Sequence, residues 1–317
     1  MPRPRPAAAA AASAVTLLAG CAPAPAPMPA VPLDAAAPIA SCGVAVTPLQ
    51  EPAERIVAVK STAAELVVAL GLGESLVTTA ALDGPLDGAD APTIDGMPSR
   101  EAVLDLDPDA VVAGWESAFA PEAMGDRQQL ARLGVTTWVS PAACWSTEVP
   151  PLTWEALLEE LLAAATVLGV PDAGTRLIAD QRAAVDAIEP VEGGASALWY
   201  SSGEDAPYVG AGSGAPQLVL ETAGLANVAA DIDETWATMS WEAVAASDPA
   251  VIVLVDAAWH SADSKIERLR ANPATAALEA VQQERFIVVP FPMAEAGVGT
   301  VEAVRLVADE ARSMGIG

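Results

Sequence analysis

The sequence predicts an α/β fold with two lobes, each with a central parallel sheet flanked by helices, joined by one long backbone helix. Short apolar runs, typical of strands that are buried on both faces, alternate with segments of helical periodicity. This order of elements occurs in the first half of the chain and again in the second half. Between the halves, residues 172–189 keep a helical pattern without an internal proline, which at ~1.5 Å per residue gives a helix of roughly 27 Å.

In the first half, the apolar run 56–59 is predicted to be a buried strand that leads into a helix. Thr62 and Glu65 have capping-box spacing at the start of this helix, and Gly71 and Gly73 are predicted to end it. Two further helix–strand units follow, with strands at 110–113 and 135–139.

The second half repeats this order. A strand at 197–202 precedes a helical segment at 215–225, and a helix that begins near Trp241 leads through an Asp-Pro turn to a strand that ends at Asp256. A last helix and strand lie within 271–291. We therefore expect an N-terminal lobe at 42–171, a linking helix at 172–190 and a C-terminal lobe at 191–317.

Residues 1–21 have the features of a secretory signal. Arg3 and Arg5 precede an apolar run that is too short to span a membrane as a helix. The run ends in Leu18-Ala19-Gly20-Cys21, which resembles the bacterial lipoprotein box, in which the cysteine becomes the lipidated first residue of the mature protein. The alternative is an ordinary signal peptide with an incidental cysteine. Residues 22–41 are rich in Pro and Ala and are predicted to be a tether.

The chain is strongly acidic. Its formal net charge of −27 becomes −29 when the two arginines of the signal are removed. A charge of this sign gives no electrostatic footprint for nucleic acid. No second segment approaches transmembrane length, so we expect a protein that is attached to the extracytoplasmic face of the membrane only through its lipid anchor.

Cys42 and Cys144 remain in the mature chain. In an exported protein they can form a disulfide, but spacing alone does not show proximity, so a disulfide and two free thiols both stay open. The single histidine, His260, leaves no Cys/His metal cluster, and no metal site is predicted.

Several short motifs carry a family resemblance through their order. They are Glu54-Arg55-Ile56-Val57, Leu70-Gly71-Leu72-Gly73, Leu106-Asp107-Pro108-Asp109, and Asn272-Pro273 followed by Leu278 and Arg285-Phe286. In this order they resemble the substrate-binding proteins of bacterial ABC importers for cobalamin and ferric siderophores, the class III periplasmic binding proteins, from about Cys42 to the end of the chain. The resemblance implies two α/β lobes joined by one long helix, with the ligand in the cleft between them. We expect neither enzymatic activity nor a cofactor of the protein's own.

Finer motifs resemble one actinobacterial subgroup of that family. They lie at residues 113–117, 140–144, 198–203, 214–217 and 255–259. The subgroup is proposed to import coenzyme F420-0, the deazaflavin coenzyme without its polyglutamate tail. The resemblance therefore implies a conjugated, anionic ligand.

The family resemblance also implies a docking role for two glutamates. Glu101 and Glu242 match the positions at which each lobe docks onto arginines of the membrane permease, and both lie at the start of a helix that leads into an Asp-Pro turn. The alternative is a glutamate that only favours the helix dipole. We expect the partners to be an ABC permease with its ATPase and a small-molecule ligand, and the protein to be a monomer.

Side chains at the carboxyl ends of the predicted strands are the candidate ligand contacts, because ligands of open α/β sheets bind beyond these ends. They are Lys60, Ser61, Trp115, Glu116, Tyr200, Ser201 and Trp259. A tryptophan face can stack on a flat ring, and Lys60 beside a helix N-terminus can bind an anionic group. The alternatives are tryptophans packed in the core and a lysine on a surface turn.

The loop that follows the strand at 197–202 contains Gly210-x-Gly212-x-x-Ala215, a relaxed form of the dinucleotide fingerprint. That interpretation fails, because the glycines do not directly follow the strand and an exported protein meets no pool of nicotinamide nucleotide. We expect instead a loop across the cleft, in which Tyr208 and Gln217 contact the ligand and the amides at Gly210 and Gly212 approach a phosphate or carboxylate. A plain surface loop is the alternative.

The sequence thus favours a solute receptor that captures a small conjugated anionic cofactor, with coenzyme F420-0 as the first candidate, and delivers it to an ABC importer. Cobalamin, haem and a ferric siderophore are the alternative ligands, and His260 and Tyr208 are the candidate haem ligands. A remote alternative is an extracytoplasmic hydrolase that uses Glu116 with Glu204 or Asp205 as a carboxylate pair.

Overall fold

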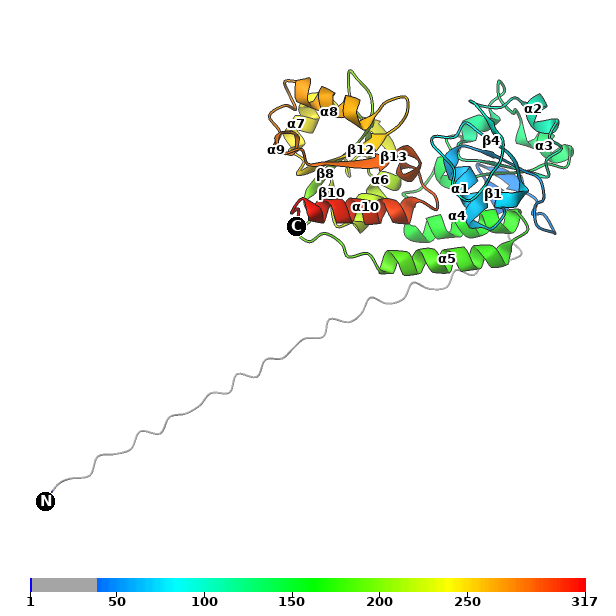
Figure 1. Cartoon of the computed structure of the whole chain (residues 1–317), viewed down its shortest axis with the longest axis horizontal. Coiled ribbons are helices and arrows are strands. Elements are labelled where there is room, and N and C mark those ends of the chain that lie inside the picture. Colours follow the sequence, from blue (N-terminus) through cyan, green and yellow to red (C-terminus); the bar gives the residue numbers. More distant parts are fainter. Residues whose placement is uncertain (2–38) are drawn as a thin grey trace. The chain divides into compact units, whose positions relative to one another are not determined.

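The computed structural model describes residues 39–317 together with Met1, so the predicted signal, Cys21 and most of the predicted tether lie outside the described residues. In the described part of the chain, each half builds its own sheet and surrounds it with helices (Figure 1). The predicted α/β fold with parallel sheets flanked by helices is confirmed.

The N-terminal lobe contains a five-stranded parallel sheet in the order β5–β4–β3–β6–β7. The central strands are buried at every residue, which explains their unbroken apolar sequences. The strands of this sheet are β3 (Ile56–Val59), β4 (Leu76–Ala80), β5 (Thr93–Ile94), β6 (Ala110–Ala113) and β7 (Thr136–Val139). The helices of this lobe are α1 (Ser61–Ala69), α2 (Arg100–Leu104), α3 (Arg127–Arg132) and the 3₁₀ turns η1 (Gly73–Ser75), η2 (Glu116–Phe119) and η3 (Pro141–Ala143).

The C-terminal lobe contains a six-stranded sheet in the order β11–β9–β8–β12–β13, with β10 also paired to β8. The strands β8, β12 and β13 are parallel, whereas β9 and β11 add an antiparallel edge. The strands are β8 (Ser196–Ser202), β9 (Tyr208–Gly210), β10 (Ala226–Asn227), β11 (Trp236–Thr238), β12 (Val251–Asp256) and β13 (Phe286–Pro290). The helices are α6 (Ala215–Thr222), α7 (Trp241–Ser247), α8 (Ala262–Ala271), α9 (Glu279–Gln282), α10 (Thr300–Ser313) and the 3₁₀ turn η4 (Phe291–Ala294).

Alternate residues of β12 build the two cores of this lobe. Val251, Val253 and Val255 pack with α6 and α10, while Ile252 and Leu254 pack on the other face with α7, α8 and α9. Figure 1 shows these two sets of helices on opposite faces of the sheet. Because this strand is covered on both faces, its sequence is apolar and does not alternate between polar and apolar residues.

A pair of packed helices, α4 (Trp154–Val167) and α5 (Pro171–Asp186), follows the N-terminal sheet. Gly174 permits their close approach, because a Cβ at this position would lie 2.4 Å from the Cβ of Ala165.

The helix predicted at 172–190 is too long at its C-terminal end. Helix α5 stops at Asp186, and residues 187–195 lead to β8 without helical structure. Pro190 accounts for this stop, because its ring would clash with the Asp186 carbonyl in a continued helix. Gly193 and Gly194, both with positive φ, lie in the segment that follows.

Two further predictions at the N-terminal side of the fold are wrong. The tether does not extend to residue 41, because Ile39–Ser41 forms strand β1 and pairs with β2 (Val44–Val46). The buried Ser41 hydroxyl bonds to the backbone of Val139, which ties this hairpin to β7. The expected capping box is also absent from α1, since Lys60 is the N-cap residue and no side chain caps the helix. Gly71, with φ +77°, does follow the end of α1 as predicted.

Cys42 and Cys144 are joined in a disulfide, which answers the question that spacing left open. The bond ties the turn of the β1–β2 hairpin to the segment after η3. In the described part of the chain, no helix combines the length and the apolar character that a membrane span needs.

Candidate functional site

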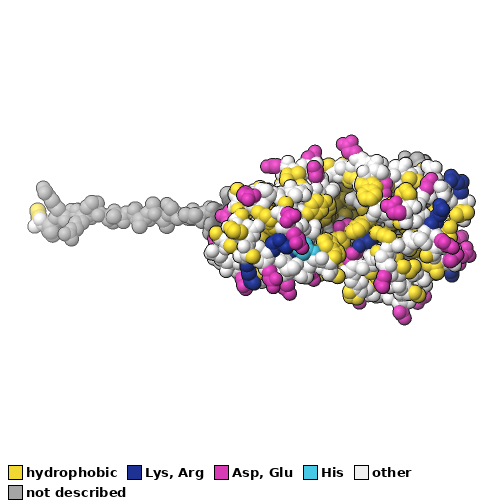
Figure 2. All heavy atoms as spheres, turned by 90° about the horizontal axis from the view of Figure 1, so that it is seen from above, with side chains coloured by type: hydrophobic (Ala, Val, Ile, Leu, Met, Phe, Trp, Pro, Cys, Tyr) yellow, Lys and Arg dark blue, Asp and Glu magenta, His cyan; other side chains and the backbone are white. Residues whose placement is uncertain are grey.

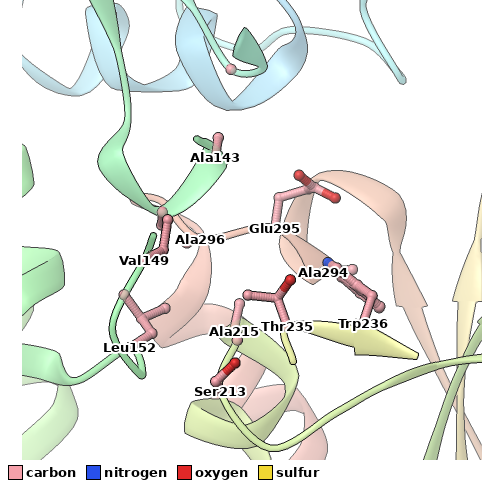
Figure 3. A pocket seen from close by; sticks show the side chains of 13 residues that line it. Ala143, Val149, Leu152, Ser213, Ala215, Thr235, Trp236, Ala294, Glu295 and Ala296 are labelled. Atoms are coloured by element: carbon pink, nitrogen blue, oxygen red, sulfur yellow. The ribbon is translucent and has the colours of Figure 1, made fainter. Parts of the chain in front are cut away.

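A narrow cavity lies between the two lobes, at the carboxyl ends of the parallel strands (Figure 3). Its walls come from Gly114 beyond β6, the segment after β7, the loop before α6, and the segment beyond β13. Figure 2 shows a hollow in the middle of one face, with apolar side chains around it. The residues that line the cavity are Gly114, Ala142, Ala143, Val149, Leu152, Ser213, Gly214, Ala215, Thr235, Trp236, Ala294, Glu295 and Ala296.

The cavity is far smaller than a cofactor site. Its volume is about 40 Å³, whereas pockets for drug-sized ligands measure roughly 300–1,000 Å³. A ligand of the expected size therefore does not fit inside this cavity unless its walls move.

Lys60 and Ser61 lie together at the end of β3, but their polar groups contact the protein. The Lys60 ammonium forms an ion pair with Asp83, and the Ser61 hydroxyl accepts a hydrogen bond of 2.8 Å from the Asp83 backbone N–H. The Lys60 side chain is 8% exposed. An anionic ligand would have to compete with this carboxylate, and the predicted anion-binding role of Lys60 stays a prediction.

The backbone of Lys60 is held in an uncommon conformation. Its φ of +77° lies in the left-handed region, which costs a non-glycine residue on the order of 1 kcal/mol. The backbone of Gly114 passes close to Lys60 and leaves no room for a side chain, because a Cβ on Gly114 would lie 2.3 Å from the Thr62 hydroxyl and 3.0 Å from the Lys60 Cβ. Strain of this kind at a strand end is typical of a functional site.

Trp115 of the N-terminal lobe contacts the opposite lobe beside this cavity. Its indole N–H donates a hydrogen bond of 2.9 Å to Oε2 of Glu295, and its ring meets the ring of Phe291 edge to face at 6.1 Å. The Lys60 ammonium lies 4.0 Å from the centre of the same ring. Trp115 is thus at the cleft, as predicted, but in this structure its ring packs on protein groups.

Glu295 is the functional candidate that sequence reasoning missed. It follows η4 beyond the carboxyl end of β13, and applying the strand-end rule to β13 would have found it. Burial raises the pKa of its carboxyl, and the charge of Asp83 acts in the same direction, against the hydrogen bond from Trp115 and the charge of Lys60. Its carboxylate is therefore costly to keep ionised when the lobes are closed.

A third carboxyl of this region belongs to Glu65 on α1. Burial raises its pKa, and Asp83 raises it further. A Cβ at Gly299, on the C-terminal lobe, would lie 3.7 Å from Oε2 of Glu65. The carboxyl groups of Glu65 and Glu295 thus both interact with Asp83, which is paired with the Lys60 ammonium.

Glu116 holds the segment that follows the disulfide. Its carboxylate accepts hydrogen bonds from the backbone N–H groups of Trp145, at 2.7 Å, and Ser146, at 2.9 Å, and from the Ser146 hydroxyl. Burial acts to raise the pKa of Glu116, but these hydrogen bonds outweigh it and lower the pKa. These contacts give Glu116 a structural role, and its predicted contact with a ligand stays a prediction.

The carboxylate pair of the hydrolase alternative gains no support from this geometry. Glu204 forms an ion pair of 3.1 Å with Arg268 in the C-terminal lobe, while Glu116 is bound to the N-terminal lobe as described above. Among the described residues, Cys42, Cys144 and Glu116 are the group with metal-ligand proximity, but the two sulfur atoms form the disulfide and leave no thiolates.

Tyr200 and Ser201 do not face the cleft with free groups. Tyr200 is completely buried, its ring packs edge to face on Trp241, and its hydroxyl donates a hydrogen bond of 2.7 Å to the Gly203 carbonyl. Burial raises the pKa of this hydroxyl to about 12. Ser201 is also buried. In this structure both side chains are buried within the C-terminal lobe, whose strand β8 lies in the middle of its sheet, and the predicted ligand contacts stay predictions.

The glycine-rich loop has a packing role. The N–H groups of Ala211, Gly212 and Ser213 donate to backbone carbonyls of residues 232–235, so they are not free to bind a phosphate. A Cβ at Gly210 would lie 2.2 Å from Pro216, and one at Gly212 would lie 2.1 Å from the Ala230 carbonyl oxygen. The amide of Gly212 is therefore bonded to Ile232, and close packing explains why both positions are glycine. The anion-binding role predicted for Gly210 and Gly212 stays a prediction.

Gln217 also contacts the protein. Its Oε1 accepts a hydrogen bond of 3.1 Å from Nδ2 of Asn227, and the same amide group of Asn227 donates to the carbonyls of Gly210 and Ala211. The amide of Gln217 therefore belongs to the network that holds the loop before α6.

Two aromatic groups remain near the cleft. Tyr208, 39% exposed, stacks on Trp236 with ring centres 5.9 Å apart and planes at 18°, and Trp236 lines the cavity. Trp259, 61% exposed, packs edge to face on Phe291 at 5.8 Å. The predicted aromatic contacts Tyr208 and Trp259 thus keep exposed ring surface, and Trp236 adds a ring that the sequence did not single out.

Glu101 and Glu242 have equivalent places in the two lobes. Each is an exposed second residue of a short helix, α2 or α7. The caps match as well, since the hydroxyls of Ser99 and Ser240 accept hydrogen bonds from the N–H groups three residues later. The geometry makes both carboxylates available at the surface.

Two α/β lobes with a site between the carboxyl ends of their strands define a two-lobed solute receptor. The sequence matches the periplasmic binding protein family over residues 56–293, and the chain belongs to this family. Members are extracytoplasmic proteins that bind small solutes, without enzymatic activity, and work with an ABC permease and its ATPase.

Solved structures agree with this membership. The chain is similar to an ABC-type Fe³⁺-hydroxamate transport system from Saccharomonospora viridis DSM 43017, with 25% identity, coverage of 86% of this chain and 98% of that chain, and a TM-score of 0.71. For the periplasmic haem-binding protein RhuT from Roseiflexus sp. RS-1, the identity is 25%, the coverage 82% and 98%, and the TM-score 0.66. For the vitamin B12-binding protein BtuF of Vibrio cholerae, the identity is 22%, the coverage is 84% of this chain and 99% of that chain, and the TM-score is 0.58. A search of curated proteins found no match.

Proposed function

We propose that this chain captures a small, flat conjugated molecule between its lobes and delivers it to an ABC importer. Coenzyme F420-0 is the first candidate carried over from the sequence motifs. Cobalamin, haem and a ferric siderophore are the alternatives, and similar structures carry titles that name a hydroxamate system, haem and vitamin B12. We also propose lipid anchoring through Cys21 and a monomeric state.

One observation carries the choice of a flat conjugated ligand. Trp236 lines the interlobe cavity with its ring stacked on the exposed ring of Tyr208. Trp115, Phe291 and Trp259 form a second row of rings, each in edge contact with the next. Aromatic faces of this kind add about 0.5–1.5 kcal/mol to a ring contact beyond the area that it buries.

The anionic character of the ligand has less support. It depended on Lys60 and on the amides of the glycine-rich loop, and these groups have protein partners in this structure. An anionic ligand would have to displace Asp83 from Lys60.

Titration of the purified protein tests the function. Tryptophan emission is followed while coenzyme F420-0, cyanocobalamin, haem or a ferric hydroxamate is added. We expect saturable quenching by one of them, lost in Trp236→Ala and kept in Trp145→Phe, which changes an exposed tryptophan that does not line the cavity. The liganded protein should also stimulate the ATPase of its permease. No binding of any of the four, together with no stimulation, would refute the proposal.

A further inference from the structure

Glu295 is the carboxylate of the cavity wall that closes onto the opposite lobe. It comes from the C-terminal lobe, lines the interlobe cavity and accepts the indole N–H of Trp115 from the N-terminal lobe at 2.9 Å. Figure 3 shows its side chain extending from the segment beyond η4, on the side of the cavity where Trp236 also lies. This hydrogen bond exists only while the lobes are together.

A ligand of ordinary size in this cavity would compete for this bond. The cavity of about 40 Å³ has to widen, Glu295 is part of its wall, and the donor Trp115 comes from the opposite lobe. A buried carboxylate that loses its donor without a replacement is costly. A ligand that closes the lobes again therefore has to supply a donor to Glu295 in place of the indole.

The charges around Glu295 limit what that donor can be. The Lys60 ammonium is paired with Asp83 and also attracts the Glu295 carboxylate, whereas the charge of Asp83 acts against both Glu295 and Glu65. Burial raises the pKa of both Glu295 and Glu65, although Lys60 and the Trp115 indole act against this rise at Glu295. A positive group would relieve this imbalance, whereas an anionic group would increase it.

The rings nearby suit a positive group. The Lys60 ammonium over the Trp115 ring, 4.0 Å from its centre, is a cation–π contact already present in the cleft. The charge of Glu295 acts on the hydroxyl of Tyr208, so this carboxylate lies near the Tyr208–Trp236 stack as well. An aromatic wall next to a carboxylate recognises flat cations through both the ring face and the charge.

We infer that Glu295 is the polar anchor of the ligand and selects a flat molecule with a cationic or N–H-bearing group, which takes the place of the Trp115 indole N–H. This inference rests on the proposed function and narrows it to a ligand without a net negative charge at this point of contact. It ranks coenzyme F420-0, with its phosphodiester, and haem, with its two propionates, below neutral and cationic ligands.

Three probes that share a three-ring fused core and differ in charge test the inference. Proflavine is a cation, riboflavin is neutral and riboflavin 5′-phosphate is an anion, and the fluorescence anisotropy of each reports binding to the purified protein. We expect affinity to fall in that order. Glu295→Gln should weaken proflavine about tenfold, as expected for a charge-assisted hydrogen bond, and riboflavin less than threefold. Glu310→Gln, an exposed carboxylate of the same lobe, is the matched control and should change neither.

A second variant separates anchoring from folding. Trp115→Phe keeps a ring but removes the N–H that competes for Glu295, so proflavine should bind a few-fold tighter. If Trp115 and Glu295 only stabilised the closed lobes, both Trp115→Phe and Glu295→Gln would bind proflavine more weakly. That result would overturn the inference.

The remaining outcomes separate the inference from the proposed function. If riboflavin 5′-phosphate binds as tightly as proflavine, or Glu295→Gln weakens proflavine and riboflavin equally, the inference fails and the proposed function stands. The same holds if all three probes fail while one of the four ligands of the first titration binds. Failure of every ligand in both experiments overturns both.

Discussion

A buried carboxyl on α4 should make the stability of the protein depend on pH near neutrality. Glu160 points from α4 toward the end of β7, where it accepts hydrogen bonds from the Ser140 hydroxyl and the Ala142 backbone N–H. Burial nevertheless raises the pKa of this carboxyl from its ordinary value of 4.5 to about 7, because the two hydrogen bonds compensate only part of the lost hydration. We expect Glu160→Gln, which keeps the shape and removes the charge, to be more stable than the native protein at high pH.

The size and the sign follow from the two pKa values. Below pH 4.5 the carboxyl is protonated in the folded and unfolded states, so it costs nothing. As the pH rises from 4.5 through about 7, the unfolded state loses its proton first and the free energy of unfolding falls. At about 1.4 kcal/mol for each pH unit, the loss reaches about 3 kcal/mol above pH 7.

Urea denaturation followed by circular dichroism between pH 5 and pH 8 measures this effect. The difference in unfolding free energy between Glu160→Gln and the native protein should grow by about 2–3 kcal/mol over this range. Glu159→Gln, which changes the exposed neighbouring carboxylate, is the matched control and should follow the native profile. Parallel pH profiles for Glu160→Gln and the native protein would refute the reasoning.

Three further predictions follow from other parts of the molecule. Charge reversal at Glu101 and Glu242 should leave ligand affinity within twofold but reduce import by more than tenfold; equal import in cells would contradict permease docking. Gly212→Ala should destabilise the protein by about 2 kcal/mol in thermal unfolding, because the new Cβ would lie 2.1 Å from the Ala230 carbonyl oxygen, and an unchanged melting temperature would show that the loop can shift. Lys265→Met should cost about 2–4 kcal/mol in urea unfolding, since the fully buried ammonium, with a pKa lowered to about 8 by burial, donates to two backbone carbonyls; a cost below 1 kcal/mol would disprove its structural role.

The fold was predictable because buried parallel strands have a strong local signature. The apolar runs at 56–59 and 110–113 became β3 and β6 without a change of boundary, since strands covered on both faces are apolar at every position. Helix α4 was missed although Thr153 caps it and leucines recur at helical spacing. The prediction assigned the connection between the lobes to a single helix, the one at 172–190, and named no helix directly before it. The edge strands β9 and β11 are short and carry mixed residues, so their pairing depends on partners that the sequence does not display.

The candidate site was less predictable, because it depends on which partner each polar group finds. Strand ends correctly placed Lys60, Trp115 and Trp259 near the cleft, but no spacing in the sequence pairs Lys60 with Asp83, 23 residues away. Tyr200 sits at a strand end as well, and only the position of β8 inside its sheet turns its ring into the core. Sequence position thus identifies the edge of the sheet, whereas packing decides which side chains there are free.

The hydrogen bonds between the lobes lie at different places, some at the cavity and some at the start of α4. Besides the Trp115–Glu295 bond at the cavity, the Leu152 N–H donates to the Ser213 carbonyl at 2.8 Å and the Trp154 indole N–H donates to the Thr222 hydroxyl at 2.9 Å. The last two join the start of α4 to the C-terminal lobe, and Trp154 also packs against the core of that lobe. A neutral hydrogen bond contributes about 1 kcal/mol and one to a charged group about 1.5–3 kcal/mol. Leu152 and Ser213 also line the cavity, so widening it affects their bond as well. Trp154 and Thr222 do not line it, and their bond can keep the lobes joined at α4 while the aromatic walls part.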